Sequence, residues 1–520
     1  MSKTTVNHHL VVQWLEAVRA QLRTPTPREA LDLGGIDVLD VLLSPLFMAA
    51  IMELRRHDGE PPRGAIGRLS EAIRQRGYRL KLALAERRAC SESAAAQATD
   101  VLVWPRDIRQ FAGQGPVSQA LVDAGLRCDF LSCDPWVFRQ LRDRGVRSVY
   151  SLRAWPGVLR AARHEARQRV RQVGTLARER LPLYRQDGFE RDLSATYWST
   201  VAQSLPAACK AVANARAALE AFSPKLVIVG NDKTTEGRAA CLVARQQNIP
   251  TAVLHHGHSF GNPLNGLHRA DRIVVYGDVH RRDLLSVGIE ESRVLTCGAP
   301  YLDQRPRQTG KMHPDLARLL KPGPDQPYVL VATSGPGHTV SHHQHALVIE
   351  QLMGLSNRFP QVLFAVKLHR KDHVNYYRQV ADRVGAHRLR IIPDATPEFP
   401  RDIFGWLQGC RAVLTGASTV AIEAMLMDVP VITMDFCDEI HDIDFIDIGA
   451  TLHVTSGDQL DERLRDVLGQ HEVIGHLRAK AAEYLQDSFF KLDGQSAKRT
   501  AEALAALLRG QTIEPARAEK

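Results

Sequence analysis

The sequence predicts an α/β protein with two doubly wound parallel sheets that face each other across a cleft, preceded by a helical extension. Three observations support this fold class. Short apolar runs of strand length alternate with segments of helical periodicity in two series, which begin near residues 101 and 328. A linker rich in proline and polar residues separates the two series. The residues before the first series have helical spacing and lack strand-like runs.

These features divide the 520 residues into five parts. At 44% hydrophobic and 24% charged residues, the chain is long and apolar enough for two or three domains with substantial cores. The parts are a helical accessory region (1–95), a first domain with an arginine-rich insertion (96–303), a linker (304–327), a second domain with a terminal helix (328–510) and a polar tail (511–520). The apolar stretch 38–52 contains Asp40 and Pro45, so we expect a buried helix there in preference to a monotopic membrane contact.

The charge and the cysteine content indicate the compartment in which the protein works and the kinds of partner it binds. Eight cysteines without a CxxC pair, and no signal peptide, predict reduced thiols in a cytoplasm. A net charge of +9 predicts a polyanionic neighbour. Much of the excess lies in residues 159–185, which form either a solvated helix or a face that docks on an anionic membrane. Aromatic residues do not interleave with the arginines, which argues against nucleic acid.

In the first domain, strands are expected near residues 101–104, 128–132, 226–230, 251–256, 272–277 and 293–300. Residues 111–125 resemble a glycine-bearing turn that leads into a helix. Functional groups gather beyond the carboxyl ends of parallel strands, and the residues in that position are Asp232, His255, His256, His258 and Tyr276. Asp232 is equally well interpreted as a helix N-cap, and the histidines as residues that order a loop or bind phosphate.

In the second domain, residues 413–436 predict a strand, a small-residue turn, a helix and a second strand. Ser418 and Thr419 start the helix, and unpaired N–H groups at a helix N-terminus suit a nucleotide phosphate. Glu423 lies four residues after Thr419 and therefore on the same face of the helix. There its carboxylate could accept hydrogen bonds from sugar hydroxyls.

A second loop, after the strand that begins at residue 328, is predicted to approach the same phosphate. Its small and polar residues let the backbone come close to an anion; they are Ser334, Gly335, Gly337 and His338. Two groups of residues could be interpreted as metal sites, but a purely structural role is favoured for both. A zinc site at His342, His343 and His345 lacks the usual ligand pattern, and an Asp442/Asp444 magnesium motif is too short to be specific.

Three segments together resemble the GT-B superfamily of nucleotide-sugar-dependent glycosyltransferases, in which two Rossmann-like domains hold donor and acceptor. The segments are residues 226–240 with 255–257, residues 334–338 and residues 415–432. Residues 255–303 look like bacterial surface-polysaccharide enzymes, including CDP-glycerol glycerophosphotransferases and capsule sugar transferases.

The resemblance also implies roles for single residues. Lys367 and His369 would bind donor phosphate, although Arg370 stands where such families usually have proline. Ser418 and Thr419 would contact donor phosphate, and Glu423 the ribose or sugar. No metal and no cofactor other than the nucleotide-sugar substrate is implied.

Transfer of a sugar needs a base near the acceptor hydroxyl, and the candidates are Asp232, His256 and His258. The expected function is therefore a cytoplasmic, metal-independent glycosyltransferase that acts on a surface polysaccharide or a lipid-linked glycan at the inner membrane face. Three alternatives stay open. Residues 226–237 resemble the strand and turn of a UDP-sugar 2-epimerase, a relative with the same fold. A CDP-glycerol-type phosphotransferase and a non-catalytic nucleotide-binding module are the others. The helical extension favours a transferase.

Overall fold

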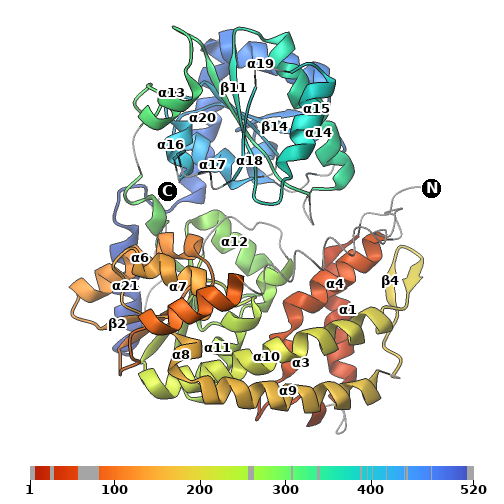
Figure 1. Cartoon of the computed structure of the whole chain (residues 1–520), viewed down its shortest axis with the longest axis vertical. Helices are drawn as coiled ribbons and strands as arrows, with labels where there is room; N and C mark the ends of the chain where they lie inside the picture. The colour runs from red at the N-terminus through yellow and green to blue at the C-terminus, as the bar shows by residue number, and fades with distance from the viewer. Residues whose placement is uncertain are drawn as a thin grey trace. The chain divides into compact units, whose positions relative to one another are not determined.

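The computed structural model of the chain describes residues 6–23, 29–56, 81–177, 179–255, 263–305, 308–336, 340–386, 389–394, 396, 398–400, 402–416, 418–438, 440, 443–469 and 471–511. These residues form two compact units (Figure 1). Unit 1 comprises the described residues of 1–303 and 491–520, and unit 2 comprises those of 304–490.

Unit 1 is built on a parallel sheet whose order, over the described residues, is β3-β2-β1-β6-β7-β8-β9. The strands are β1 (Val101–Trp104), β2 (Cys128–Ser132), β3 (Ser148–Tyr150), β6 (Leu226–Val229), β7 (Thr251–Leu254), β8 (Arg272–Val275) and β9 (Val294–Thr296). Every residue of β1 and β6 is buried, as expected for central strands covered on both faces. The strand order reverses between β1 and β6, which pair in register from Val101 with Leu226.

Helices cover the sheet of unit 1. They are α6 (Ile108–Asp123), α7 (Pro135–Arg142), α8 (Ser151–Ala154), α9 (Pro156–Leu176), α10 (Ser194–Phe222), α11 (Thr235–Gln246) and α12 (Asp278–Ser286), with short turns η1 (Pro263–Leu267), η2 (Glu291–Arg293) and η3 (Pro300–Leu302). A hairpin of β4 (Tyr184–Gln186) and β5 (Phe189–Arg191) lies between α9 and α10. The glycine-bearing turn expected at 111–125 is wrong, because α6 runs through it. A Cβ on Gly113 would meet no atom within 4 Å, so helical backbone is accommodated there.

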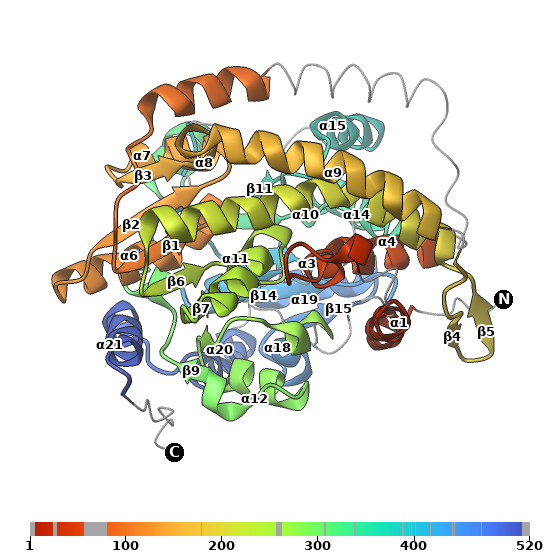
Figure 2. The ribbon, with the colours of Figure 1, turned by 90° about the horizontal axis from the view of Figure 1, so that it is seen from below.

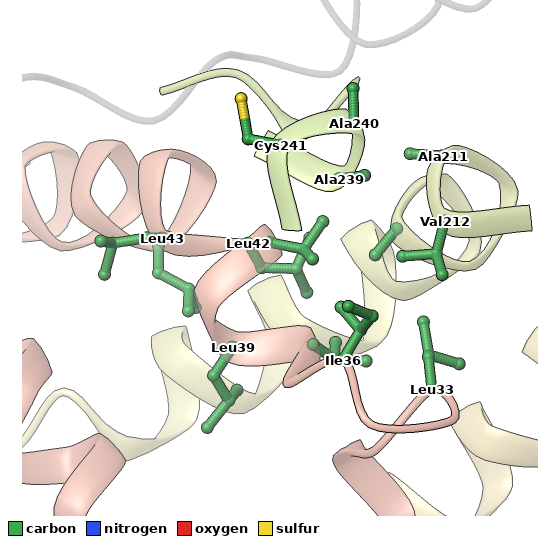
Figure 3. Packing of buried hydrophobic residues seen from close by; sticks show 14 of the residues in the cluster. Leu33, Ile36, Leu39, Leu42, Leu43, Ala211, Val212, Ala239, Ala240 and Cys241 are labelled. Atoms are coloured by element: carbon green, nitrogen blue, oxygen red, sulfur yellow. The ribbon is translucent and has the colours of Figure 1, made fainter. Parts of the chain in front are cut away.

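The N-terminal extension is helical, as predicted, and forms part of unit 1. Its helices are α1 (His8–Gln21), α3 (Val38–Val41) and α4 (Leu43–Arg56). Figure 3 shows Ile36 beside Val212 of α10 and Leu42 pointing towards Ala239 of α11. The apolar stretch 38–52 is therefore mostly buried, in the two helices α3 and α4, and Met52 at its end is 55% exposed. In the part of the chain that the structure describes, no helix is long and apolar enough to cross a membrane.

A buried charge cluster fastens this extension to the rest of unit 1. The Asp40 carboxylate, 5% exposed, accepts hydrogen bonds from Arg238 (2.6 Å), Arg19 (3.0 Å) and Arg269 (3.0 Å). Burial alone would raise the pKa of Asp40, but the three guanidinium groups outweigh it and lower the pKa. Arg238 also donates to the backbone oxygens of Asp232 and Leu267. The extension is thus tied to the loops that follow β6 and β7.

Unit 2 contains the second parallel sheet, with the order β12-β11-β10-β13-β14-β15 among described residues. The strands are β10 (Tyr328–Ala332), β11 (Leu363–Lys367), β12 (Arg390–Ile392), β13 (Ala412–Thr415), β14 (Val431–Met434) and β15 (Leu452–Val454). The helices are α13 (Pro314–Leu320), α14 (His342–Arg358), α15 (Val374–Arg383), α16 (Ile403–Leu407), α17 (Thr419–Met425), α18 (Asp444–Asp447), α19 (Gly457–Gly469) and α20 (His471–Ser488). The predicted strand, turn, helix and strand at 413–436 are β13, α17 and β14. Here the order reverses between β10 and β13.

The prediction that the second domain (328–510) ends in a single terminal helix is wrong. Two helices occupy this region, α20 in unit 2 and α21 (Ser496–Leu508) in unit 1. The Asp303 carboxylate caps α21 by accepting from the N–H groups of Ser496 (3.0 Å) and Ala497 (2.7 Å). Leu504 then buries itself in the core beside α6. The terminal helix therefore belongs with unit 1 and not with the second domain.

Candidate functional site

The loops after β10 and β13 lie side by side at the switch point of unit 2. Ser334 and Gly335 follow β10, and Gly416 follows β13. A Cβ on Gly416 would lie 3.7 Å from Ser334 Oγ, so the two loops are in contact. The structure thus brings together two segments that the sequence suggested as phosphate loops. The small cavity at these loops has a volume of about 30 Å³, which leaves room for no more than about two water molecules.

Lys367 and Glu423 form the second pair that the structure brings together. Lys367 Nζ lies 3.7 Å from Asp394 Oδ1 and 5.9 Å from the ring centroid of Trp406. Burial raises the pKa of Glu423 to about 8; the charge of Lys367 lowers it in part and that of Asp402 raises it further. The Glu423 carboxyl is therefore largely neutral at pH 7, so it can donate as well as accept a hydrogen bond.

His369 is held in one orientation by the loop after β11. Its backbone N–H donates to Thr333 Oγ1 and to Asp372 Oδ2, both at 2.8 Å. Burial lowers its pKa; Asp372 opposes this, and nearby basic side chains add to it. His369 Nδ1 accepts from the Lys371 N–H at 3.2 Å, so in the neutral ring the proton is on Nε2. His369 is thus a hydrogen-bond donor at neutral pH.

Gly335 is required by this arrangement. A Cβ at Gly335 would lie 2.6 Å from Lys371 Cβ and 3.2 Å from His369 Nδ1. Any larger residue would push the loop after β10 away from the loop after β11.

Asp372 organises the base of the same loop. Its buried carboxylate bonds to Thr333 Oγ1 and lies 2.8 Å from His345 Nε2. Burial alone would raise its pKa, but these hydrogen bonds lower it. His345 is thereby explained as a structural partner of Asp372. Across the described residues, no group of three or more His, Cys, Asp or Glu side chains is arranged to hold a metal ion.

The remaining predicted residues of unit 2 differ in their surroundings. Ser418 Oγ accepts from the Val420 N–H at 3.3 Å and is the N-cap of α17, as predicted. Thr419 is exposed. Their contact with phosphate stays a prediction, since α17 spans only seven residues. Gly337 and His338 lie outside the described residues, as does Asp442.

In unit 1, Asp232 is fully buried and its carboxylate is occupied. Oδ1 lies 2.6 Å from His268 Nδ1, and Oδ2 accepts from the N–H groups of Arg269 (2.6 Å) and Ala270 (2.9 Å). Burial alone would raise the pKa of Asp232, but His268 and the backbone lower it. The N-cap of α11 is Thr234, so the N-cap interpretation of Asp232 is wrong. Asp232 holds the loop before β8, and this geometry does not favour it as a base.

The histidines predicted beside Asp232 are only partly described. His256 and His258 lie outside the described residues, whereas His255 is included. Its ring centroid lies 5.9 Å from those of His268 and His280. The backbone oxygen of His255 accepts from Tyr276 Oη at 2.8 Å.

A cavity of about 260 Å³ lies at the switch point of unit 1 and was missed by the sequence analysis. Arg106, Asn231 and Glu236 line it. Among described residues, neither Arg106 nor Glu236 makes an ion pair with its side chain. The sequence did contain a pattern that could have predicted this cavity. Arg106 follows β1 by two residues, and Glu236 lies in the first turn of α11, the helix after β6. Asp232 was chosen from the same segment instead.

The two doubly wound units define the class of protein: an α/β chain with two Rossmann-like domains of the GT-B type, a fold shared by enzymes that use nucleotide sugars. The sequence model of the UDP-N-acetylglucosamine 2-epimerase family matches residues 171–504. Because this is more than half of the chain, the protein belongs to that family. No curated protein sequence matches the chain.

Solved structures of low sequence identity share the fold. A putative UDP-N-acetylglucosamine 2-epimerase from Listeria monocytogenes is 16% identical, with a TM-score of 0.54, over 81% of this chain and all of that one. MnaA of S. aureus, solved with UDP, is 14% identical with a TM-score of 0.53, over 80% of this chain and 99% of that one. The UDP-N-acetylglucosamine 2-epimerase of Neisseria meningitidis is 13% identical with a TM-score of 0.50, over 79% of this chain and all of that one.

The predicted glycosyltransferase function is wrong. The family match supports the alternative taken from residues 226–237, a UDP-sugar 2-epimerase. The error has a physical cause, since both kinds of enzyme use the same fold and the sequence pattern identified the fold alone. The likeness to CDP-glycerol glycerophosphotransferases finds no support in these comparisons.

Proposed function

We propose that the protein inverts the configuration at C2 of a UDP-linked amino sugar of the UDP-N-acetylglucosamine type. The observation that carries this proposal is the family match over residues 171–504. That stretch includes the turn between β6 and α11 as well as the loops of unit 2 at Ser334, Lys367 and Ser418. The proposed reaction needs a nucleotide sugar and no acceptor.

The chemistry of unit 2 suits the nucleotide end of such a substrate. A diphosphate carries negative charge and accepts hydrogen bonds, and Lys367 supplies positive charge within the same loops as the Nε2–H donor of His369. The neutral Glu423 carboxyl can donate to one ribose oxygen and accept from another hydroxyl. These roles support a site for the UDP moiety in unit 2.

Inversion at C2 requires a proton to leave that carbon and a proton to return on the opposite face. A group that moves a proton must have a free basic atom within reach of it. Asp232 has its oxygens occupied, so we assign it to holding the loop. His256 and His258 stay candidates for proton transfer, and we add Glu236, whose carboxylate lines the cavity of unit 1.

The test is incubation with UDP-N-acetylglucosamine in heavy water, without acceptor, followed by proton nuclear magnetic resonance and mass spectrometry. We expect the C2 epimer to form and deuterium to appear at C2. Lys367→Met should weaken substrate binding, and Glu236→Gln should stop deuterium uptake while leaving UDP binding intact. Lys498→Met, an exposed lysine of α21, is the matched control and should behave as the unmodified protein.

Two results would contradict the proposal. One is that no deuterium enters C2 of UDP-N-acetylglucosamine under conditions in which the protein binds UDP. The other is release of the nucleotide only after an acceptor glycan is added.

A further inference from the structure

Helix α9 of unit 1 carries a straight stripe of arginines. Its 21 residues include five arginines and a single glutamate, Glu165. Four of the arginines are spaced by three, four and four residues, so they lie on one side of the helix over about 16 Å. They are Arg160, Arg163, Arg167 and Arg171, and all four are exposed. The opposite side packs on α10 (Figure 2).

None of the four stripe arginines has an ion-pair or hydrogen-bond partner within the residues that the structure describes. The fifth arginine shows the contrast. Arg169 pairs with Glu165 at 2.9 Å and donates to the backbone oxygens of Glu29 and Ala30, so it serves the fold. A solvated helix face normally mixes both signs of charge. The positive charge of the four stripe arginines is therefore not neutralised by other described residues of the chain.

Exposed apolar side chains lie at the end of α9. The chain leaves Leu176 and soon enters the β4–β5 hairpin, at the same end of unit 1 in Figures 1 and 2. Leu183 and Phe189 of this hairpin region are each 42% exposed. Met52 of α4 is 55% exposed and precedes Glu53, which lies 3.8 Å from Arg191 of the hairpin. The exposed apolar side chains thus lie at the end of unit 1 to which the carboxyl end of α9 leads.

We propose that α9 and the adjacent hairpin form a docking face for a bilayer that contains anionic lipids. The stripe would pair with lipid phosphates, and Leu183 and Phe189 would enter the headgroup region, where apolar side chains gain by leaving water. Single-stranded nucleic acid fits less well, because bases need aromatic side chains interleaved with the basic residues and α9 has none. This docking is independent of the proposed epimerase activity.

The test is co-sedimentation of the full-length protein with vesicles of phosphatidylcholine, with or without phosphatidylglycerol, at low and raised ionic strength. We expect binding only to the anionic vesicles and loss of binding as salt rises. Each arginine near the surface should contribute about fivefold in affinity, so changing all four to glutamine should weaken binding by about a hundredfold or more. The variant combines Arg160→Gln, Arg163→Gln, Arg167→Gln and Arg171→Gln.

Three further variants test separately the positive charge of the stripe, the apolar contact of the hairpin and the net charge of the whole protein. Changing the four arginines to lysine should restore most of the binding, which also shows that the helix still folds. Phe189→Ser should weaken binding without altering its dependence on salt. A control with the same loss of charge should bind as the unmodified protein; it changes four exposed arginines of unit 2 to glutamine, Arg378, Arg411, Arg465 and Arg478.

Specific results would overturn the inference. Equal binding to neutral and anionic vesicles would show that the protein does not recognise anionic lipid. Unchanged binding of the glutamine variant would show that the four arginines do not contact the bilayer. Tight binding of duplex DNA or RNA, without vesicle binding at the same salt, would assign the stripe to a nucleic acid instead.

Discussion

The Glu423 carboxyl provides a quantitative test of the site in unit 2. Its pKa is raised from 4.5 to about 8, chiefly by burial. Between these two values the unfolded chain loses its proton while the folded chain keeps it. The free energy of unfolding therefore falls as pH rises from about 4.5 to about 8, and it is constant on either side of that window.

The substitution Glu423→Gln replaces the acid by a neutral group of the same shape, so this pH dependence should disappear. The full shift corresponds to about 5 kcal/mol, at about 1.4 kcal/mol for each pH unit. Glu423 keeps partial exposure, and solvent screening reduces such values, so we expect about 2 to 3 kcal/mol. The variant should match the unmodified protein near pH 4.5 and be more stable by that amount at pH 8.

The measurement is urea-dependent unfolding of unit 2 at about pH 5 and about pH 8, followed by pulse proteolysis and mass spectrometry of its fragments. Glu472→Gln, an exposed glutamate of α20, is the control and should show no change of stability with pH relative to the unmodified protein. A stability difference for Glu423→Gln that is the same at both pH values would refute the argument. It would mean that the carboxyl is ionised in the folded protein.

Four further substitutions test other parts of the structure. Asp40→Asn leaves Arg238 buried without its charge partner and should lower the free energy of unfolding by about 3 to 5 kcal/mol in urea. Gly237→Ala should lower the melting temperature, since its Cβ would lie 2.1 Å from the Asn231 backbone oxygen. In contrast, Gly113→Ala within α6 should raise stability by about 0.5 to 1 kcal/mol. Asp372→Asn should weaken UDP binding measured by calorimetry, while circular dichroism stays unchanged.

The strands were the most predictable part of the fold. β1 and β2 coincide with the expected segments, because a strand covered on both faces is a short continuous apolar run. Helix α6 was less predictable. Its glycines suggest a turn, but Phe111 packs over Gly115 and the helix continues. The division between α20 and α21 depends on the Asp303 cap, which is almost two hundred residues away in sequence.

In the site, spacing identified loops more reliably than it identified side chains. Ser334, Lys367 and Glu423 were predicted because Ser334 follows β10, Lys367 ends β11 and Glu423 lies on the helix after β13. Their roles stay predictions. The raised pKa of Glu423 depends on burial by the whole unit, and no local pattern encodes it. The pairing of His345 with Asp372 likewise joins α14 to the loop after β11, so sequence spacing favoured ordinary structure over a zinc site at His345 but could not name its partner.

The turn between β6 and α11 shows why the reaction was harder to predict than the fold. Asp232 and Glu236 are four residues apart, and both carboxylates follow the same strand. Which of them meets solvent is decided by the loop before β8, whose N–H groups and His268 enclose Asp232. Glu236 is left at the cavity because it lies one helical turn further on. A local sequence pattern thus points to this turn, while distant residues decide which of the two carboxylates is left at the cavity.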